Sequence, residues 1–164
     1  MSGETAGRML VAATCVLLGA RAVVIRGPSG SGKSTLAWIL INTPGPCRFA
    51  RLVCDDQVFV QPRDERLLAT PVPAIAGRIE VRGLGIVPIA FAPIAQVGLI
   101  ADLTPAHEIA RLPQREDLSA ELAGTRLPRL AVPIASPLAA ALVADAMSHL
   151  ATGGDLYDFI AEST

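Results

Sequence analysis

The residues best suited to chemistry in this sequence form a glycine-rich run between an apolar segment and a helical one. Residues 27–34 read GPSGSGKS and match the pattern G-x-x-x-x-G-K-[ST]. An apolar strand before this pattern and a helix after it are the context of a loop that binds nucleoside triphosphates. Backbone amides and the helix N-terminus would face the phosphates, Lys33 would reach the β- and γ-phosphates, and the Ser34 hydroxyl would ligate Mg²⁺. The candidate nucleotide-binding residues are Gly27, Pro28, Ser29, Gly30, Ser31, Gly32, Lys33, Ser34 and Thr35.

A pair of adjacent carboxylates could decide which reaction follows nucleotide binding. Asp55 and Asp56 end the apolar run 52–54. Such acids can hold a metal or take a proton from an acceptor, and they repel each other unless Mg²⁺ or Lys33 neutralises the pair. Because successive strand residues point to opposite faces, both reach one site only if the backbone bends there. A surface acidic turn is the alternative interpretation.

A second charged pair lies in a strand-like segment. Glu80 and Arg82 flank Val81 and therefore share one face of a strand, and the glycines of the following run 83–85 allow a close backbone approach. This arrangement fits a ligand site. The alternative is an exposed strand edge guarded by charged residues.

The elements around these residues alternate between strands and helices. Runs 10–18 and 22–25 predict a hairpin that leads into the glycine-rich loop, and a helix follows over residues 36–41. The other expected elements are strands at 51–54, 57–61, 97–103 and 129–134, an extended path at 69–76, a strand at 78–87 broken by two glycines, a polar loop or short helix at 107–116, and a helix at 138–150. Antiparallel neighbours on both sides of the loop predict an α/β fold with a mixed sheet.

Composition narrows the class of protein further. The 164 residues fit one domain, residues 1–164, and a net charge of −1 excludes a general electrostatic footprint for nucleic acid or anionic membranes. Three cysteines, an odd number, indicate buried thiols in a reducing compartment, and we expect a cytoplasmic protein. The apolar run from Met9 to Gly19 imitates a signal peptide, but it is shorter than the ~20 residues of a membrane-spanning helix, so no membrane insertion is expected.

The order of three motifs resembles one protein family. GPSGSGKS at 27–34, LVCDD at 52–56 and IEVRGLGI at 79–86 resemble the catalytic, C-terminal domain of HPr kinase/phosphorylase, in the short form found in alphaproteobacteria. The resemblance covers about residues 14–130. It implies a fold related to phosphoenolpyruvate carboxykinase and an enzyme that uses ATP and Mg²⁺ to phosphorylate a serine of the phosphocarrier HPr of the phosphotransferase system. It also implies the reverse phosphorolysis and a homo-oligomer, a hexamer.

The resemblance also assigns roles to individual residues. Lys33 would bind phosphate, and Asp56 would deprotonate the acceptor serine. Ser34 and Glu80 would ligate the metal, with Asp55 as their partner on the metal side.

The role of Arg111 has two possible interpretations. Arg111 occupies the position of a family arginine that would stabilise charge on the transferred phosphoryl group. The alternative is an arginine at the rim of the molecule, paired with Glu108.

Two positions depart from the family pattern. The family has a histidine shortly before the phosphate loop, whereas this chain has Ala12 in the corresponding stretch, and the basic loop of longer members corresponds here to the uncharged residues 132–137. The sequence therefore supports the kinase reaction more than phosphorolysis. Two alternatives stay open: a nucleotide-binding regulatory module with impaired catalysis, and a P-loop kinase of small metabolites with an arginine-rich lid.

Overall fold

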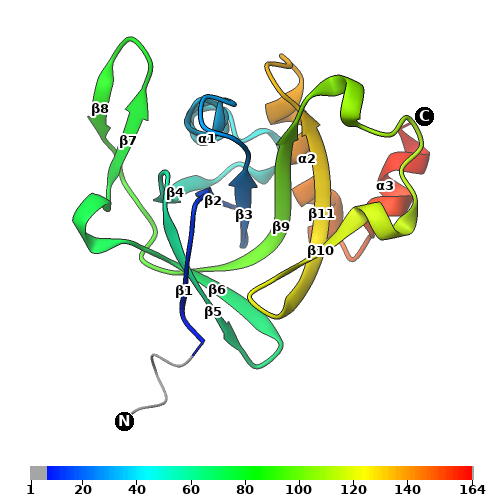
Figure 1. Cartoon of the computed structure of the whole chain (residues 1–164), viewed down its shortest axis with the longest axis horizontal. Coiled ribbons are helices and arrows are strands. Elements are labelled where there is room, and N and C mark those ends of the chain that lie inside the picture. The colour runs from blue at the N-terminus through cyan, green and yellow to red at the C-terminus, as the bar shows by residue number, and fades with distance from the viewer. Residues whose placement is uncertain (1–6, 164) are drawn as a thin grey trace.

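The computed structural model describes residues 7–163, which form one large sheet, a small two-stranded sheet and three α-helices (Figure 1). The strands are β1 (Met9–Val11), β2 (Thr14–Leu18), β3 (Arg21–Arg26), β4 (Ala50–Cys54), β5 (Val58–Arg63), β6 (Arg66–Pro71), β7 (Arg78–Val81), β8 (Gly85–Pro88), β9 (Ala95–Thr104), β10 (Ser119–Leu122) and β11 (Thr125–Pro133). The helices are α1 (Lys33–Asn42), α2 (Ala139–Ala151) and α3 (Leu156–Glu162). Four 3₁₀ turns connect them: Gly45–Cys47, Pro73–Ile75, Ala106–Glu108 and Arg115–Leu118.

The large sheet is mixed, as the sequence predicts. Its strand order is β1-β5-β6-β9-β3-β2-β4, with β11 also beside β9 and β10 beside β11. Strands β3, β9 and β11 run parallel, while the other pairs are antiparallel. The carboxyl ends of the three parallel strands therefore meet at one edge, at the top of Figure 1, where ligands bind in sheets of this kind.

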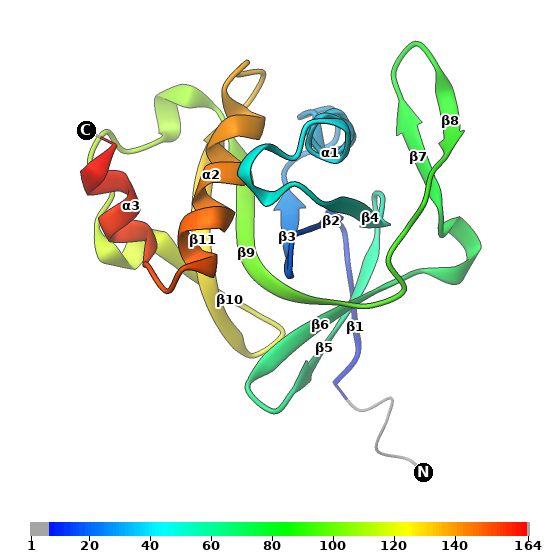
Figure 2. The same cartoon turned by 180° about the vertical axis from the view of Figure 1, so that it is seen from behind.

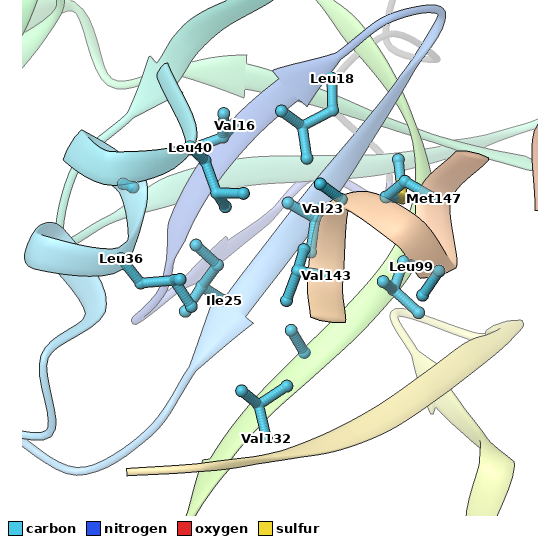
Figure 3. Close-up of a cluster of buried hydrophobic side chains, with 14 of the residues drawn as sticks. Val16, Leu18, Val23, Ile25, Leu36, Leu40, Leu99, Val132, Val143 and Met147 are labelled. Carbon is cyan, nitrogen blue, oxygen red and sulfur yellow. The ribbon is translucent and has the colours of Figure 1, made fainter. Parts of the chain in front are cut away.

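Helices α1 and α2 cover one face of this sheet. Strand alternation sends Val23 and Ile25 towards the helices and Val24 towards a second apolar cluster on the opposite face. Val23 and Ile25 pack with Leu36 of α1 and with Val143 and Met147 of α2 in an apolar layer (Figure 3). Seen from behind, α2 lies in front of β9 and β11 (Figure 2). This packing fixes where α1 begins, and so where the glycine-rich loop must pass.

A group of three charged residues ties the parallel strands together near this edge. Asp102 of β9 accepts hydrogen bonds from Arg26 Nε (2.7 Å) and Nη2 (2.8 Å) on β3, and from Arg129 Nε (2.8 Å) on β11. Burial raises the pKa of Asp102, but the hydrogen bonds from the two arginines lower it more, so it lies below its usual value. The same hydrogen bond to Asp102 raises the pKa of Arg26. Because Arg26 directly precedes Gly27, this group anchors the start of the loop.

Most of the expected elements are present. The hairpin before the loop, the helix after it, the strands on both sides of Asp55 and Asp56, and the helix that ends before Gly153 all form. Within residues 7–163, no helix is long and apolar enough to cross a membrane.

Several expectations are wrong in detail. Segment 78–87 is two strands of a hairpin, β7 and β8, because the glycines form a turn in which Leu84 N donates to Val81 O (2.9 Å). Part of the expected extended path, Pro73–Ile75, is a 3₁₀ turn. Strand β10 and helix α3 were not expected. Cys47 is only half-buried, whereas the other two cysteines are fully buried as predicted.

Candidate active site

The glycine-rich loop connects β3 to α1 and presents an open inner face. Gly30 and Gly32 have φ angles of 79° and 98°, a backbone conformation that side chains rarely adopt. A Cβ atom at either position would meet nothing within 4 Å, so the space beside the loop is free for a ligand. Gly32 caps α1 without a side-chain hydrogen bond, which leaves the first helical N–H groups available to an anion.

The side chain of Lys33 folds back and bonds to the start of the glycine-rich loop. Its Nζ donates to the carbonyl oxygens of Gly27 (2.7 Å) and Pro28 (3.1 Å). Gly27 itself allows no side chain, because a Cβ there would lie 2.6 Å from Ser31 Oγ and 3.0 Å from Leu103 Cβ. The only lysine of the chain is thus held at the mouth of the loop, within reach of a phosphate bound there.

Asp55 is buried and accepts hydrogen bonds from three elements. Its Oδ1 accepts from Thr14 Oγ1 (2.9 Å) on β2 and from Ser34 Oγ (2.7 Å) on α1, and its Oδ2 accepts from the Glu80 amide (3.0 Å) on β7. These bonds compensate for the burial of the carboxylate. Asp55 therefore fixes the Ser34 hydroxyl and links the loop to the β7–β8 hairpin.

Asp56 remains at the pocket while Asp55 turns inward, because the backbone bends at Asp56. Its φ of 67° is left-handed, and its amide donates to Thr14 Oγ1 (3.2 Å). The strand irregularity beside Cys15 in the β2–β4 pairing accompanies this bend. Whereas Asp55 is buried, Asp56 is exposed. The sequence predicted that both acids could reach one site only if the backbone bends there, and this bend is present.

A polar pocket of about 440 Å³ lies between the loop and the β7–β8 hairpin. Its lining residues are Ser29, Gly30, Gly32, Lys33, Ser34, Thr35, Asp56, Glu80 and Arg82. One basic group on the loop and one on the hairpin, Lys33 and Arg82, share this pocket with the carboxylates of Asp56 and Glu80. The pocket can therefore hold a phosphate chain between cations while a carboxylate faces the acceptor.

The donors in this pocket suit Mg²⁺ bound together with a nucleotide. Among residues 7–163, no group of three or more His, Cys, Asp or Glu side chains could hold a metal ion. Mg²⁺ is commonly held by one or two protein ligands, with phosphate oxygens and water completing its shell. Ser34 Oγ directs its proton to Asp55 and keeps its lone pairs for a cation, and Glu80 lines the same pocket.

The structure does not bring every candidate residue to this pocket. Arg111 is exposed, between the 3₁₀ turns Ala106–Glu108 and Arg115–Leu118, and does not line the pocket. Gly27, Pro28 and Ser31 belong to the loop but not to the lining. Sequence reasoning gave Arg82 no specific role and missed Thr14, whose side chain looks like an ordinary β-branched strand residue. Only the register of β2 against β4 shows that this hydroxyl meets both acids.

A loop of this kind between a parallel strand and a helix, with buried and exposed acids at the next strand end, defines a P-loop domain of the phosphoryl-transfer class. Comparison with protein families agrees: the model of the HPr Serine kinase C-terminal domain matches residues 4–153. The chain belongs to this family, which confirms the predicted resemblance and the prediction of an enzyme of the kinase class.

A solved structure shows the same fold. The HPr(Ser) kinase/phosphatase from Coxiella burnetii superposes with a TM-score of 0.74 at 19% sequence identity, over 88% of this chain and 97% of that chain. The mixed α/β fold of the family is thereby confirmed. No curated protein matches the chain.

Proposed function

We propose that this protein is an ATP- and Mg²⁺-dependent kinase that phosphorylates a serine of an HPr-type phosphocarrier in the cytoplasm. The main observation behind the proposal is that Asp55 and Asp56 have different surroundings. One acid is buried on the Ser34 and Thr14 hydroxyls, and the other is exposed in the pocket beside Lys33. Phosphoryl transfer needs this combination of a fixed phosphate site and a free proton acceptor.

The proposed reaction transfers the γ-phosphoryl group of ATP to the serine hydroxyl. Asp56 accepts the serine proton while the serine oxygen forms a bond to the γ-phosphorus, and the bond between that phosphorus and the β,γ-bridging oxygen breaks to release ADP. Lys33 would exchange its bonds to loop carbonyls for bonds to phosphate oxygens. Arg82, from the opposite wall, would offset the charge that develops on the transferred group.

The metal would be held by Ser34 and Glu80, with Asp55 orienting the Ser34 hydroxyl. Bound there, Mg²⁺ would neutralise phosphate charge and align the β- and γ-phosphates. Asp55 accepts three hydrogen bonds already, so its proposed role is to position a metal ligand.

The forward reaction is the one these residues support. Ala12 is exposed and offers no acid or base, and the loop 133–137 beside the glycine-rich loop carries no charge. Phosphorolysis must bind an additional phosphate anion, and charged donors are the strong ligands for it. We therefore propose kinase activity with little or no reverse reaction. A role for Arg111 and a hexameric assembly stay predictions from family resemblance.

The test combines the purified protein with Mg²⁺, ATP and the HPr-type carrier from the same cell. Intact mass should show one added phosphate, which fragmentation places on a serine. Asp56→Asn should keep its ATP affinity yet lose roughly 10²–10⁴-fold in transfer rate, the range of general-base catalysis. The matched control is Asp64→Asn, since Asp64 is also exposed with a positive φ, 50°, but lies in the β5–β6 turn.

The possible results separate the candidate functions. Normal transfer by Asp56→Asn excludes this residue as the base. ATP binding by the wild type without any transfer to the carrier would favour the nucleotide-binding regulatory module. Added inorganic phosphate, if it removes the phosphate from the carrier, would show that phosphorolysis survives without a histidine at position 12.

A further inference from the structure

Two cavities far from the phosphate loop form one groove. The first, of about 350 Å³, lies between the β10–β11 hairpin and helix α3. The second, of about 330 Å³, lies between the β2–β3 turn and the last turns of α2. Pro128 and Leu150 line both cavities, so the two are direct neighbours. Each volume lies near the lower end of the ~300–1,000 Å³ of small-molecule sites.

The groove lies at the edge of the sheet opposite to the polar pocket. Arg21 begins β3, and Gly98 and Pro128 lie in the first half of β9 and β11. The groove is therefore near the amino ends of the parallel strands, whereas the phosphate loop follows the carboxyl end of β3. Helix α3 lies on the side of the molecule away from the β7–β8 hairpin (Figures 1 and 2). Its lining and that of the polar pocket have no described residue in common.

The second cavity is almost entirely apolar. Apart from one arginine, its walls are Leu18, Ala20, Gly98, Pro128, Met147, Leu150 and Ala151. The arginine, Arg21, contributes its aliphatic stem: a Cβ atom at Gly98 would lie 2.9 Å from Arg21 Cβ and 3.2 Å from its Cγ, so the stem lies against Gly98. The flexible Met147 side chain can adapt to a bound chain. This half of the groove suits an uncharged, apolar group.

The first cavity combines an apolar floor with charged groups. Leu118, Leu127 and Leu156 are buried at its floor. The charged side chains that line it are Arg115, Arg126 and Asp155. With Arg21, the whole groove has three arginines and one aspartate, and so two surplus positive charges on a chain whose net charge is −1. The charge of the groove therefore favours an anion.

Arg115 and Asp155 compensate each other. Asp155 Oδ2 lies 3.6 Å from Arg115 Nη1, and Asp155 Oδ1 accepts from Asp158 N (2.8 Å) at the start of α3. The guanidinium of Arg115 also stacks on the Tyr157 ring, with its central carbon 4.1 Å from the ring centroid. These contacts fix the wall of the cavity and leave little of either charge for a ligand.

Arg126 is the charged group that is left without a partner. Its guanidinium forms no ion pair or hydrogen bond within residues 7–163. A guanidinium presents its donors in a planar fork that matches a carboxylate, and such charged hydrogen bonds are strong. An unpaired arginine beside an apolar cavity therefore points to a ligand that has both an anionic and an apolar part.

We propose that this groove binds a small carboxylate with an apolar tail. The carboxylate lies on the Arg126 guanidinium in the first cavity, and the tail passes Leu150 and Pro128 into the second. A carboxylate without a tail leaves the apolar cavity empty, and a neutral chain leaves Arg126 unpaired. The inference goes beyond the proposed kinase reaction and does not depend on it, because the groove and the polar pocket are separate.

Titration of the isotope-labelled protein with octanoate, followed through the NMR shifts of its amides, tests the proposal. Octanoate should shift the amides of Gly98, Ala151 and Gly154 to saturation. Octanol has the same chain without the charge, and butanoate has the same charge with a shorter chain. Each buried methylene group changes the affinity roughly fourfold. Butanoate should therefore bind at least tenfold more weakly than octanoate, and so should octanol.

One variant tests the charge. Arg126→Gln should weaken the binding of octanoate at least tenfold and leave that of octanol unchanged. The matched control is Arg63→Gln, at an exposed arginine that ends β5 outside the groove, and it should alter neither affinity.

A second variant tests the apolar cavity. Ala151 is exposed at the end of α2, so Ala151→Phe fills the second cavity without crowding the core. It should weaken the binding of both octanoate and octanol at least tenfold. The matched control is Ala141→Phe, at an exposed position of the same helix outside the groove, which should alter neither.

The results separate this inference from the proposed function. The absence of saturable shifts, equal affinity for octanoate and octanol, octanoate binding that Arg126→Gln leaves unchanged, or shifts confined to the polar pocket would each overturn the carboxylate site. None of these results bears on the phosphate loop. A protein that binds octanoate as expected but transfers no phosphate to the carrier would overturn the proposed function and leave the groove as a binding site.

Discussion

Replacement of Thr14 by valine tests the central hydrogen bonds of the site, because valine keeps the shape and removes only the hydroxyl. Thr14 is 0% exposed. Its Oγ1 donates to Asp55 (2.9 Å) and accepts from the Asp56 amide (3.2 Å). The substitution therefore removes one donor from a buried carboxylate and leaves one backbone amide without its partner.

The magnitude follows from these two bonds. A hydrogen bond to a charged group contributes about 1.5–3 kcal/mol, and an unpaired buried group costs about 1–3 kcal/mol. The two effects share one hydroxyl and are not additive, so we expect the free energy of unfolding to fall by about 2–4 kcal/mol. For a chain of this size, the Tm should fall by roughly 5–15 °C. Because Thr14 also holds the bend at Asp56, transfer to the carrier should slow by about 10²-fold.

Urea unfolding and a carrier phosphorylation assay measure the two effects. Thr14→Ser is the control, since it keeps the hydroxyl and should lose only about 1 kcal/mol for the missing methyl group, with near-normal turnover. Wild-type stability and turnover in Thr14→Val would refute the reasoning. Equal damage in Thr14→Ser and Thr14→Val would show that packing, rather than the hydroxyl, is what matters.

Three further predictions concern the charged group and the thiols. Asp102→Asn should lower the free energy of unfolding by about 2–4 kcal/mol, less than the ~3–5 kcal/mol of a fully buried pair, because both arginine partners are partly exposed; denaturant titration measures this. The pKa of Asp102 lies below its usual value in the folded protein. At pH values between the folded-state pKa and the usual pKa, the unfolded state therefore binds more protons than the folded state. The stabilisation should be complete above about pH 4 and be lost as the pH falls through the folded-state pKa, and Asp102→Asn should show a weaker acid dependence of its urea midpoint. Burial raises the pKa of all three thiols, but only Cys47 is partly open to solvent, while Cys15 and Cys54 are fully buried. Mass spectrometry after brief alkylation of the native protein should therefore find Cys47 modified first, and early labelling of the other two would contradict their burial.

Local pattern and motif order were enough to predict the central part of the fold. The two apolar runs 10–18 and 22–25 and the turn between them predict a hairpin, and GPSGSGKS predicts the phosphate loop and the helix after it. The IEVRGLGI segment misled because its two glycines suit a bulge as well as a turn. Helix α3 escaped detection because Tyr157, Phe159 and Ile160 favour strands locally, although Asp155 provides a good helix cap, accepting from Asp158 N at 2.8 Å.

Long-range placement explains what the sequence could not supply at the site. Thr14 and Asp55 are 41 residues apart, and nothing in the apolar run around Thr14 indicates that its hydroxyl is needed. Arg82 and Arg111 carry the same guanidinium, and only the path of the β7–β8 hairpin places Arg82 in the pocket. The residue types in the sequence therefore predicted the chemistry of the site. The three-dimensional arrangement of the strands decided which of several similar side chains lies in the pocket.

One backbone angle, φ of Asp56, places the neighbouring carboxylates of Asp55 and Asp56 in different surroundings at the same site. In a regular strand these neighbours would point to opposite faces of the sheet, and one of them would leave the site. The left-handed φ of 67° at Asp56 instead lets Asp55 turn inward to the hydroxyls while Asp56 remains in the pocket. Aspartate and asparagine tolerate this conformation better than other side chains, so Asp56→Asn removes the proton acceptor without disturbing the bend. Asp56→Ala would remove both, and its loss of activity would not separate catalysis from geometry.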